Sequence, residues 1–142
     1  MTPSEIFHQM FDNDPFSQWM GMELLEISEG ACSLQMTVRP EMLNGFGVAH
    51  GGITFSLADS CFAFACNSRG RHAVSIHCTV EHLAPVHPGD TLRATATETH
   101  VANTLSRYDI RIENQRAETV AFFHGVAYRK KQEWSFVTMN DE

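Results

Sequence analysis

The alternation of apolar and polar residues predicts strands on both sides of a central helix. Every second residue from Cys32 to Val38 is apolar, which is the period of a half-buried strand in residues 31–38. A short amphipathic helix is expected at residues 4–11 and another strand at residues 22–27. Four further strand-like runs follow the central helix, separated by Pro-Gly and Asn-Gln turns and by prolines, at residues 73–83, 91–101, 106–113 and 119–129.

The segment 51–67 has helical length and ends before Gly70, which suits a helix stop. Its apolar residues occupy every side, and such a helix is expected to be buried on every side. Strands joined by short turns favour an antiparallel sheet, so an α+β fold is predicted. The simplest arrangement is a sheet that curls around the helix, with a second copy of the chain covering what remains. The pattern therefore predicts a dimer.

Composition narrows the class of protein. The 142 residues suit a single domain, with a loose tail at residues 131–142. A net charge of −7 disfavours a nucleic-acid partner, which would need a basic face. The N-terminus lacks a secretory signal, and the longest apolar stretch is too short to span a bilayer. The cysteines form no C-x-x-C pair and the histidines no ligand motif, so we expect a cytoplasmic protein with reduced thiols, no metal and no membrane partner.

Two glycines follow His50 at the start of the central helix. Glycine is unfavourable inside a helix by roughly 1 kcal/mol relative to alanine, and by less at a helix end. Bare backbone at this end lets a ligand approach N–H groups that point outward along a favourable dipole. A carbonyl held there would be polarised, and a developing oxyanion would be stabilised. The alternative interpretation is a glycine-rich turn without chemistry.

Asp59 lies in the middle of this apolar helix. An ionised carboxylate is costly to bury unless it is paired, and no Lys or Arg lies within four residues of it. We favour a functional role over the alternative, which is an aspartate on a thin solvent-facing stripe with Ser56 and Ser60. Gly51 and Asp59 lie about 12 Å apart along one helix, too far to act on one carbonyl. If two helices run antiparallel across a two-fold axis, Gly51 of one copy can meet Asp59 of the other, which predicts a shared site.

The string MLNGFGVAHGGITFSLADSCFAFACNSRG resembles the hotdog thioesterases of the PaaI group, from bacterial phenylacetate degradation. LNG, HGG, FSLAD and FACNS-x-G match in register, and LAPVHPGDTL resembles the family's loop after the first strand beyond the helix. Ala84 departs from the family, in which an arginine often precedes the proline. The resemblance spans residues 20–129, which would form the hotdog core.

By this resemblance, Asp59 would be the nucleophile or the general base that activates water, and Gly51 would donate its N–H to the thioester oxygen. Asn44, in the loop 41–49, would position the water or the carboxylate. His50 would fix the loop, or assist the thioester oxygen and the leaving thiol. Similar proteins line the acyl pocket with the strand after the helix and hold CoA by a later loop, so the implied substrate-binding residues are Ser75, His77, Ala102, Asn103 and Thr104.

The resemblance implies an acyl-CoA thioesterase with the hotdog fold, an antiparallel sheet wrapped around a long central helix. The implied substrate is phenylacetyl-CoA or hydroxyphenylacetyl-CoA, and because CoA is part of the substrate no cofactor is implied. The implied assembly is a homotetramer, a dimer of dimers with shared active sites. Two alternatives stay open: a hotdog enoyl-CoA hydratase or dehydratase, which pairs a histidine with an acid, and a non-catalytic acyl-CoA sensor, which would need an output domain.

Overall fold

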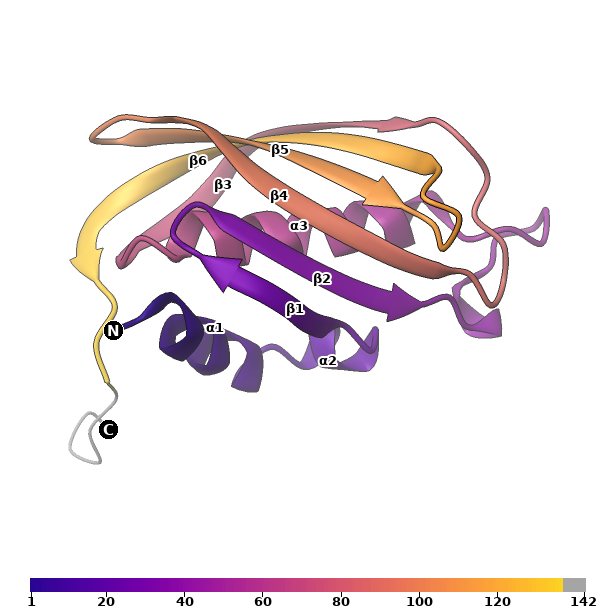
Figure 1. Ribbon diagram of the computed structural model, residues 1–142, viewed down its shortest axis with the longest axis horizontal. Coiled ribbons are helices and arrows are strands. Elements are labelled where there is room, and N and C mark those ends of the chain that lie inside the picture. Colours follow the sequence, from indigo (N-terminus) through magenta and orange to yellow (C-terminus); the bar gives the residue numbers. More distant parts are fainter. Residues whose placement is uncertain (137–142) are drawn as a thin grey trace.

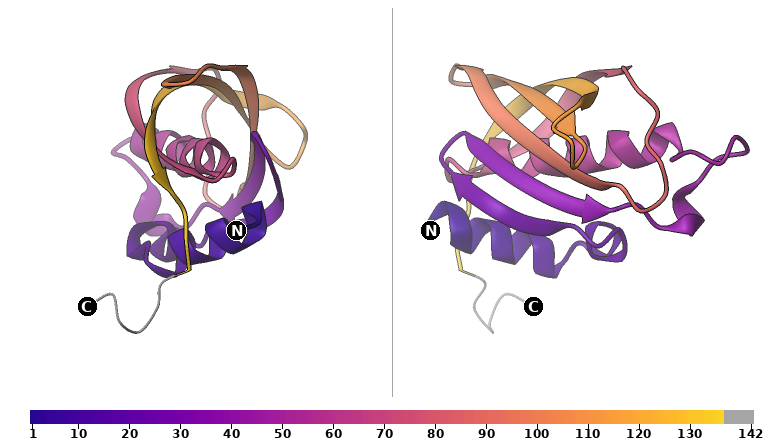
Figure 2. Two further views of the ribbon diagram at one scale, coloured as in Figure 1. Left: turned by 90° about the vertical axis from the view of Figure 1, so that its left-hand side faces the viewer. Right: turned by 45° about the vertical axis from the view of Figure 1, so that its right-hand side comes forward.

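The computed structural model describes residues 1–136. Within them, six strands form one antiparallel sheet in the order β1-β2-β4-β5-β6-β3. Their bounds are Glu23–Ser28 (β1), Ala31–Thr37 (β2), Arg71–His82 (β3), Thr91–Val101 (β4), Leu105–Glu113 (β5) and Thr119–Glu133 (β6). The sheet curls around the long helix α3, Gly51–Asn67 (Figures 1 and 2). The predicted α+β hotdog fold is confirmed.

Two helices precede the sheet, and each begins where its sequence supplies a cap. The helix α1, Pro3–Asp12, starts with a capping box in which Thr2 and Glu5 bond to each other's backbone N–H groups. The helix α2, Pro15–Trp19, starts at Asp14, whose carboxylate accepts the N–H of Ser17. The sequence did not predict α2 or the short 3-10 turn Pro40–Met42, because five and three residues are too short to show a helical period.

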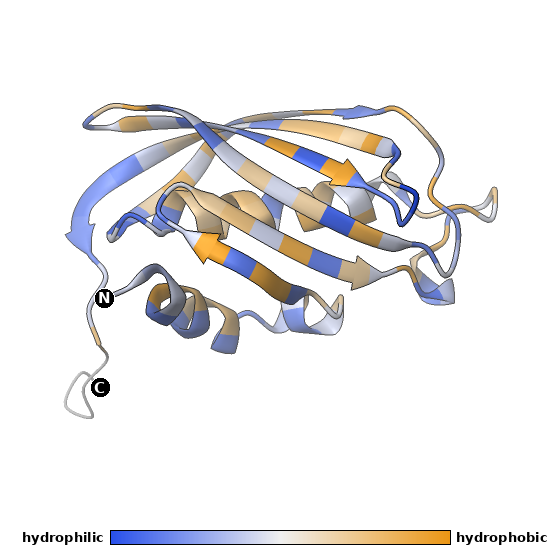
Figure 3. Ribbon diagram, viewed as in Figure 1, coloured by the Kyte–Doolittle hydropathy of each residue, from blue (hydrophilic) through white to orange (hydrophobic). Residues whose placement is uncertain are grey.

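The core lies between the concave face of the sheet and α3. Apolar residues alternate along the strands with polar ones that face outward (Figure 3). The Phe62 ring of α3 packs against Tyr108 of β5 and Phe123 of β6, with ring centroids 5.7 and 5.9 Å away. On the other side of α3, Phe64 packs edge-on against Phe7 of α1 at 4.7 Å.

Within one chain, α3 is not buried on every side. One stripe of the helix stays partly or fully exposed, at Gly52, Ser56, Asp59, Ser60 and Ala63. In a single chain this stripe is the part of the helix that the sequence pattern assigns to a second copy to cover.

The expected loose tail is also wrong at its start. The strand β6 runs on to Glu133, and the Trp134 indole then stacks on His72 with ring centroids 4.1 Å apart. The indole N–H donates to Asn67 Oδ1 at 2.9 Å, at the last residue of α3. The remainder of the expected tail, from residue 137 onward, lies outside the described residues. In the described part of the chain, no helix is long and apolar enough to cross a membrane.

Candidate active site

The start of α3 leaves one backbone donor open. His50 is the N-cap, and its Nδ1 accepts the N–H of Gly52 at 3.0 Å. This bond holds the neutral ring with its proton on Nε2 and consumes the Gly52 donor. Among residues 1–136 no acceptor takes the N–H of Gly51. The predicted bare helix end is therefore present, and a ligand oxygen could accept from Gly51.

Asn44 shapes the loop that leads into this helix end. Its Oδ1 accepts the N–H groups of Phe46 at 2.9 Å and Val48 at 3.4 Å, and its own N–H donates to the carbonyl of Val48 at 2.8 Å. His50 N–H donates to Met42 O at 2.8 Å and closes the loop onto α3. The Asn44 NH₂ group has no acceptor within the described residues, so it is available to a water or a carboxylate.

Asp59 lies two turns along the exposed stripe of α3. Its carboxylate forms no hydrogen bond or ion pair with any residue of the range 1–136, and partial burial raises its pKa above 3.8. Cys78 of β3 lies nearby, and burial together with the Asp59 charge raises the pKa of that thiol. An unpaired, partly desolvated carboxylate is typical of a group reserved for chemistry.

The two residues expected in the acyl pocket, Ser75 and His77, lie on opposite faces of β3. A bulge lies between Ser75 and His77, so their register against β6 jumps. Ser75 pairs with Ala127 and Cys78 with Gly125, two buried positions of β6, so both side chains lie on the side of β3 that faces α3. Strand alternation puts His77 on the opposite side from Cys78. One chain therefore places Ser75 on the α3 side of β3 and His77 on the opposite side.

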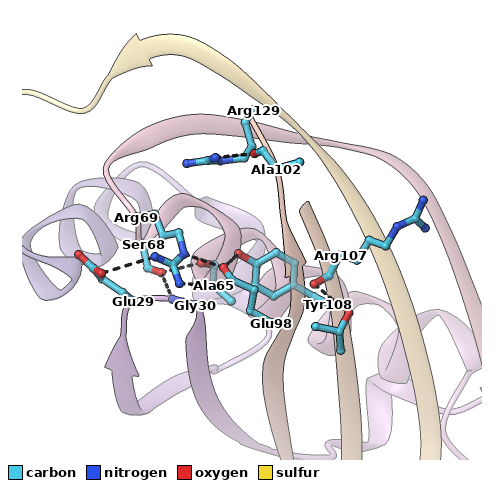
Figure 4. Close-up of polar contacts among 11 residues, drawn as sticks. Glu29, Gly30, Ala65, Ser68, Arg69, Glu98, Ala102, Arg107, Tyr108 and Arg129 are labelled. Atoms are coloured by element: carbon cyan, nitrogen blue, oxygen red, sulfur yellow. Dashed lines mark hydrogen bonds and ion pairs between the residues drawn. The ribbon is translucent and has the colours of Figure 1, made fainter. Parts of the chain in front are cut away.

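Ala102, Asn103 and Thr104 form the turn between β4 and β5, at the opposite end of the molecule from Gly51 (Figure 1). Arg129 of β6 donates to Ala102 O at 2.6 Å (Figure 4). Arg71 of β3 reaches Asn103 Oδ1 at 3.4 Å and donates to two carbonyls of β6. Neither arginine forms an ion pair with a carboxylate of residues 1–136, so the turn carries unneutralised positive charge.

Two hollows flank the start of α3. One, of about 360 Å³, has Phe16 and Trp19 of α2 as aromatic walls and reaches His50, Gly52 and Ser56. The other, of about 370 Å³, is bordered by Gly51, Thr54 and His82 and by the apolar residues Ala49, Leu83, Ala84, Pro85 and Val86. Four residues of these hollows were not among those predicted from the sequence: Phe16, Trp19, Thr54 and His82. Strand alternation from Cys78 through Val80 could have placed His82 on the helix side.

One chain thus gathers Asn44, His50 and Gly51 at the helix start and leaves Asp59 and the β4–β5 turn apart from them.

The sequence profile of the thioesterase superfamily matches residues 46–121. The acyl-coenzyme A thioesterase PaaI of Escherichia coli K12 is 45% identical over 86% of this chain and 87% of its own length. A solved structure of E. coli PaaI, from the phenylacetic acid degradation operon, superposes with a TM-score of 0.91 at 41% identity, covering 94% of this chain and 96% of the other.

A protein from Streptococcus mutans UA159, solved with acetyl-CoA bound, superposes with a TM-score of 0.77 at 25% identity and covers 80% of this chain and 91% of its own. Acetyl-CoA belongs to the acyl-CoA compounds that the name of the E. coli protein gives as its substrates. Sequence and fold thus agree along most of the chain. The chain belongs to the thioesterase superfamily and, within it, to the hotdog acyl-CoA thioesterases of the PaaI group.

Proposed function

We propose that this chain hydrolyses phenylacetyl-CoA or a hydroxylated relative to the free acid and CoA, in phenylacetate degradation in the cytoplasm. One observation carries the proposal. Among the described residues, α3 offers an N–H without an acceptor at Gly51 and a partly buried carboxylate without a partner at Asp59. An oxyanion donor and a carboxylate are the groups that thioester hydrolysis needs.

The two groups meet if two copies pair through β3. This strand is the edge of the sheet and exposes Val74 (44%) and Ile76 (57%), which favours pairing with another strand. Antiparallel pairing about a two-fold axis would bring Gly51 of one copy toward Asp59 of the other and cover the exposed stripe of α3. The proposed assembly is this dimer, and a tetramer formed from two of them.

In the proposed mechanism, the thioester oxygen accepts the N–H of Gly51, and the helix dipole adds to its polarisation. Asp59 of the second copy either attacks the carbonyl carbon directly or takes a proton from the attacking water. Direct attack breaks the C–S bond and leaves a mixed anhydride that water then hydrolyses, whereas attack by water breaks the C–S bond and gives the acid in one stage. In both cases CoA leaves as the thiolate and is protonated to the thiol. Asn44 holds that water or the carboxylate through its free NH₂ group. His50 fixes the helix start through its Nδ1, which accepts the Gly52 N–H, and its Nε2–H can donate to the thioester oxygen or the leaving thiol.

The hollow beside α2 suits an aryl acyl group, because two aromatic side chains, Phe16 and Trp19, form its walls. Pairing through β3 would also bring the β4–β5 turn of one copy toward Gly51 of the other. The CoA phosphates would then meet Arg71 and Arg129, which have no carboxylate partner in residues 1–136. This turn is the CoA-binding loop of the proposal, while Ser75 and His77 on β3 line the interface.

Thiol release from phenylacetyl-CoA, benzoyl-CoA and aliphatic CoA esters tests the proposal. Wild-type protein should hydrolyse phenylacetyl-CoA with the highest kcat/KM. Asp59→Asn should lower kcat by about 10²–10⁴-fold, because the amide can neither attack nor accept the proton. The matched control is Asp109→Asn, which alters a partly exposed aspartate paired with His124 on the outer face of the sheet. Equal loss in both variants, or full activity in Asp59→Asn, would contradict the assignment.

A hydratase is the less favoured activity for a geometric reason. Such an enzyme needs a histidine free to transfer a proton beside an acid. Here the only lone pair of the neutral His50 ring, on Nδ1, already accepts the Gly52 N–H, so this ring has no free site to take up a substrate proton.

A further inference from the structure

His82 is a histidine that the mechanism above does not use, although it borders Gly51. It is the last residue of β3, and Cys78, Val80 and His82 lie on the strand face toward α3. Its ring lies so close to Gly51 that a Cβ added there would sit 3.2 Å from Nε2 and 3.4 Å from Cε1. The ring is therefore in van der Waals range of the backbone that carries the free N–H.

A hydrogen-bond chain orients this ring. The Thr54 hydroxyl donates to Gly51 O at 3.1 Å and lies 3.2 Å from His82 Nδ1. A hydroxyl has one proton, so when it donates to Gly51 it must accept from Nδ1. This pattern assigns the neutral ring its proton on Nδ1 and leaves Nε2 as an acceptor. In the part of the chain that the structure describes, Nε2 has no hydrogen-bond partner.

The hollow beside His82 suits a slender, neutral group. Apart from Gly51, Thr54 and His82, its walls are the five apolar residues Ala49, Leu83, Ala84, Pro85 and Val86. No charged side chain lines it, so phosphates would find no counter-ion there. Its volume of about 370 Å³ would accept a linear chain.

A thioester group itself offers no hydrogen-bond donor, because its oxygen and sulfur only accept. In a CoA ester the nearest donor is the amide N–H that lies two methylenes beyond the sulfur. We propose that His82 Nε2 accepts this amide N–H. His82 is then a specificity residue that recognises the thiol arm, the chain beyond the sulfur, while Gly51 binds the carbonyl oxygen. This inference rests on the proposed function, since it assumes a thioester at Gly51. It places the acyl group on the α2 side of the helix start and the thiol arm on the β3 side.

Two small thioesters of phenylacetic acid test the inference. One carries N-acetylcysteamine, which contains the amide, and the other carries 2-acetoxyethanethiol, which has an ester oxygen in place of the N–H at the same chain length. Wild-type protein should prefer the amide by about fivefold to tenfold in kcat/KM, mostly through KM, because one hydrogen bond is lost with the ester. His82→Phe keeps a ring but has no acceptor, and it should hydrolyse both compounds equally well.

Three further variants make the test specific. His82→Gln restores an acceptor and should keep much of the preference for the amide. Thr54→Val leaves His82 in place without its orienting hydroxyl and should weaken the preference. His8→Gln, on the exposed side of α1, should behave as wild type. Thermal unfolding of each variant separates loss of fold from loss of contact.

The outcomes distinguish failure of the role proposed for His82 from failure of the proposed thioesterase function. If wild-type protein hydrolyses both compounds without preference, or His82→Phe keeps the wild-type preference, the role of His82 is wrong and the thioesterase proposal stands. If wild-type protein releases no thiol from these compounds or from phenylacetyl-CoA, the proposed function itself is wrong.

Discussion

Asp59 is kept in an environment that disfavours its charge. Burial raises its pKa above the ordinary value of 3.8, and no described residue offers it a hydrogen bond. A folded-state pKa above the unfolded one means that the native protein loses stability when this group ionises. The loss is complete above the raised pKa and is relieved as the pH falls through it.

Asp59→Asn should therefore raise the Tm at pH 7 while it lowers activity. The gain should shrink toward zero as the pH falls below the folded-state pKa, where the wild-type carboxyl is protonated as well. Thermal unfolding of both proteins between pH 3 and pH 8 measures this difference. A variant that is less stable than wild type at neutral pH would mean that the carboxylate has a favourable partner instead.

The role of Asp59 is indicated by the sequence and the role of His82 is not, although strand alternation can place His82 on the helix side. A lone carboxylate in an apolar helix contradicts the local pattern, so it stands out. His82 lies in a strand among other histidines, and its meaning depends on Gly51, 31 positions earlier in the chain. Similarly, the bulge at Ser75 and His77 changes which side chain faces α3, and nothing in the residue types indicates the jump.

At the scale of elements, β6 crosses α3 at a point where only glycine fits. A Cβ on Gly125 would lie 2.7–2.8 Å from three atoms of the Phe62 ring, which is itself 1% exposed. Gly125→Ala should therefore destabilise the fold by about 1–3 kcal/mol through overpacking. Urea unfolding measures the change. Gly45→Ala is the control, because no atom lies within 4 Å of its added Cβ and its stability should stay near wild type.

The C-terminal end of α3 is held by a polar cluster of Arg69, Glu98 and Tyr108 (Figure 4). Arg69 donates twice to the Glu98 carboxylate at 2.7 Å, and the buried Tyr108 hydroxyl donates to it at 2.6 Å. The Arg69 hydrogen bonds, assisted by Tyr108, hold the pKa of Glu98 below its ordinary value of 4.5. This cluster ties the helix to β4 and β5 and so fixes the distance between the helix ends and the sheet.

Glu98→Gln should lower the free energy of unfolding by about 1–3 kcal/mol at pH 7, since hydrogen bonds to a charged group are lost. Because the folded-state pKa of Glu98 is lowered, its contribution is present above the unfolded value and is lost as the pH falls through the folded one. The difference between variant and wild type should thus begin to shrink below pH 4.5 and disappear once the pH falls below the lowered folded-state pKa. Denaturant unfolding at several pH values checks this, and a difference that persists unchanged in acid would speak against the cluster.

Most of the helices and strands could be predicted from the local pattern of apolar and polar residues. The central helix spans the predicted residues, and β4 has the predicted bounds, because their periods of 3.6 and 2 are strong. The order β1-β2-β4-β5-β6-β3 was not predictable in this way, since it depends on contacts between distant segments. The extension of β6 to Glu133 likewise depends on its partner β3 and on the Trp134 contacts with Asn67 and His72.

At the scale of the whole molecule, a single chain contains the residues of the proposed site but keeps Gly51 and Asp59 too far apart to act together. Gly51 and Asp59 belong to one rigid helix, so no motion within the chain can bring them together. The edge strand β3 and the exposed stripe of α3 lie on the side where a second copy would pair. Ile76→Lys, which puts a charge on that edge, should convert dimers to monomers and lower activity together, as analytical ultracentrifugation and thiol release would report.

Mixed dimers test the sharing of the site directly. In a dimer of one Asp59→Ala and one Gly51→Pro copy, the proline stands at the first helical position and lacks the N–H. One site receives an intact Gly51 and an intact Asp59, and the other site receives neither. Random mixing of equal amounts makes half of the dimers mixed, so the sample should regain about a quarter of the wild-type activity. Each variant alone should stay inactive, and the regain should need unfolding and refolding together, or long incubation, to exchange copies. If each site were built from one chain, every site would keep one defect and mixing would restore nothing.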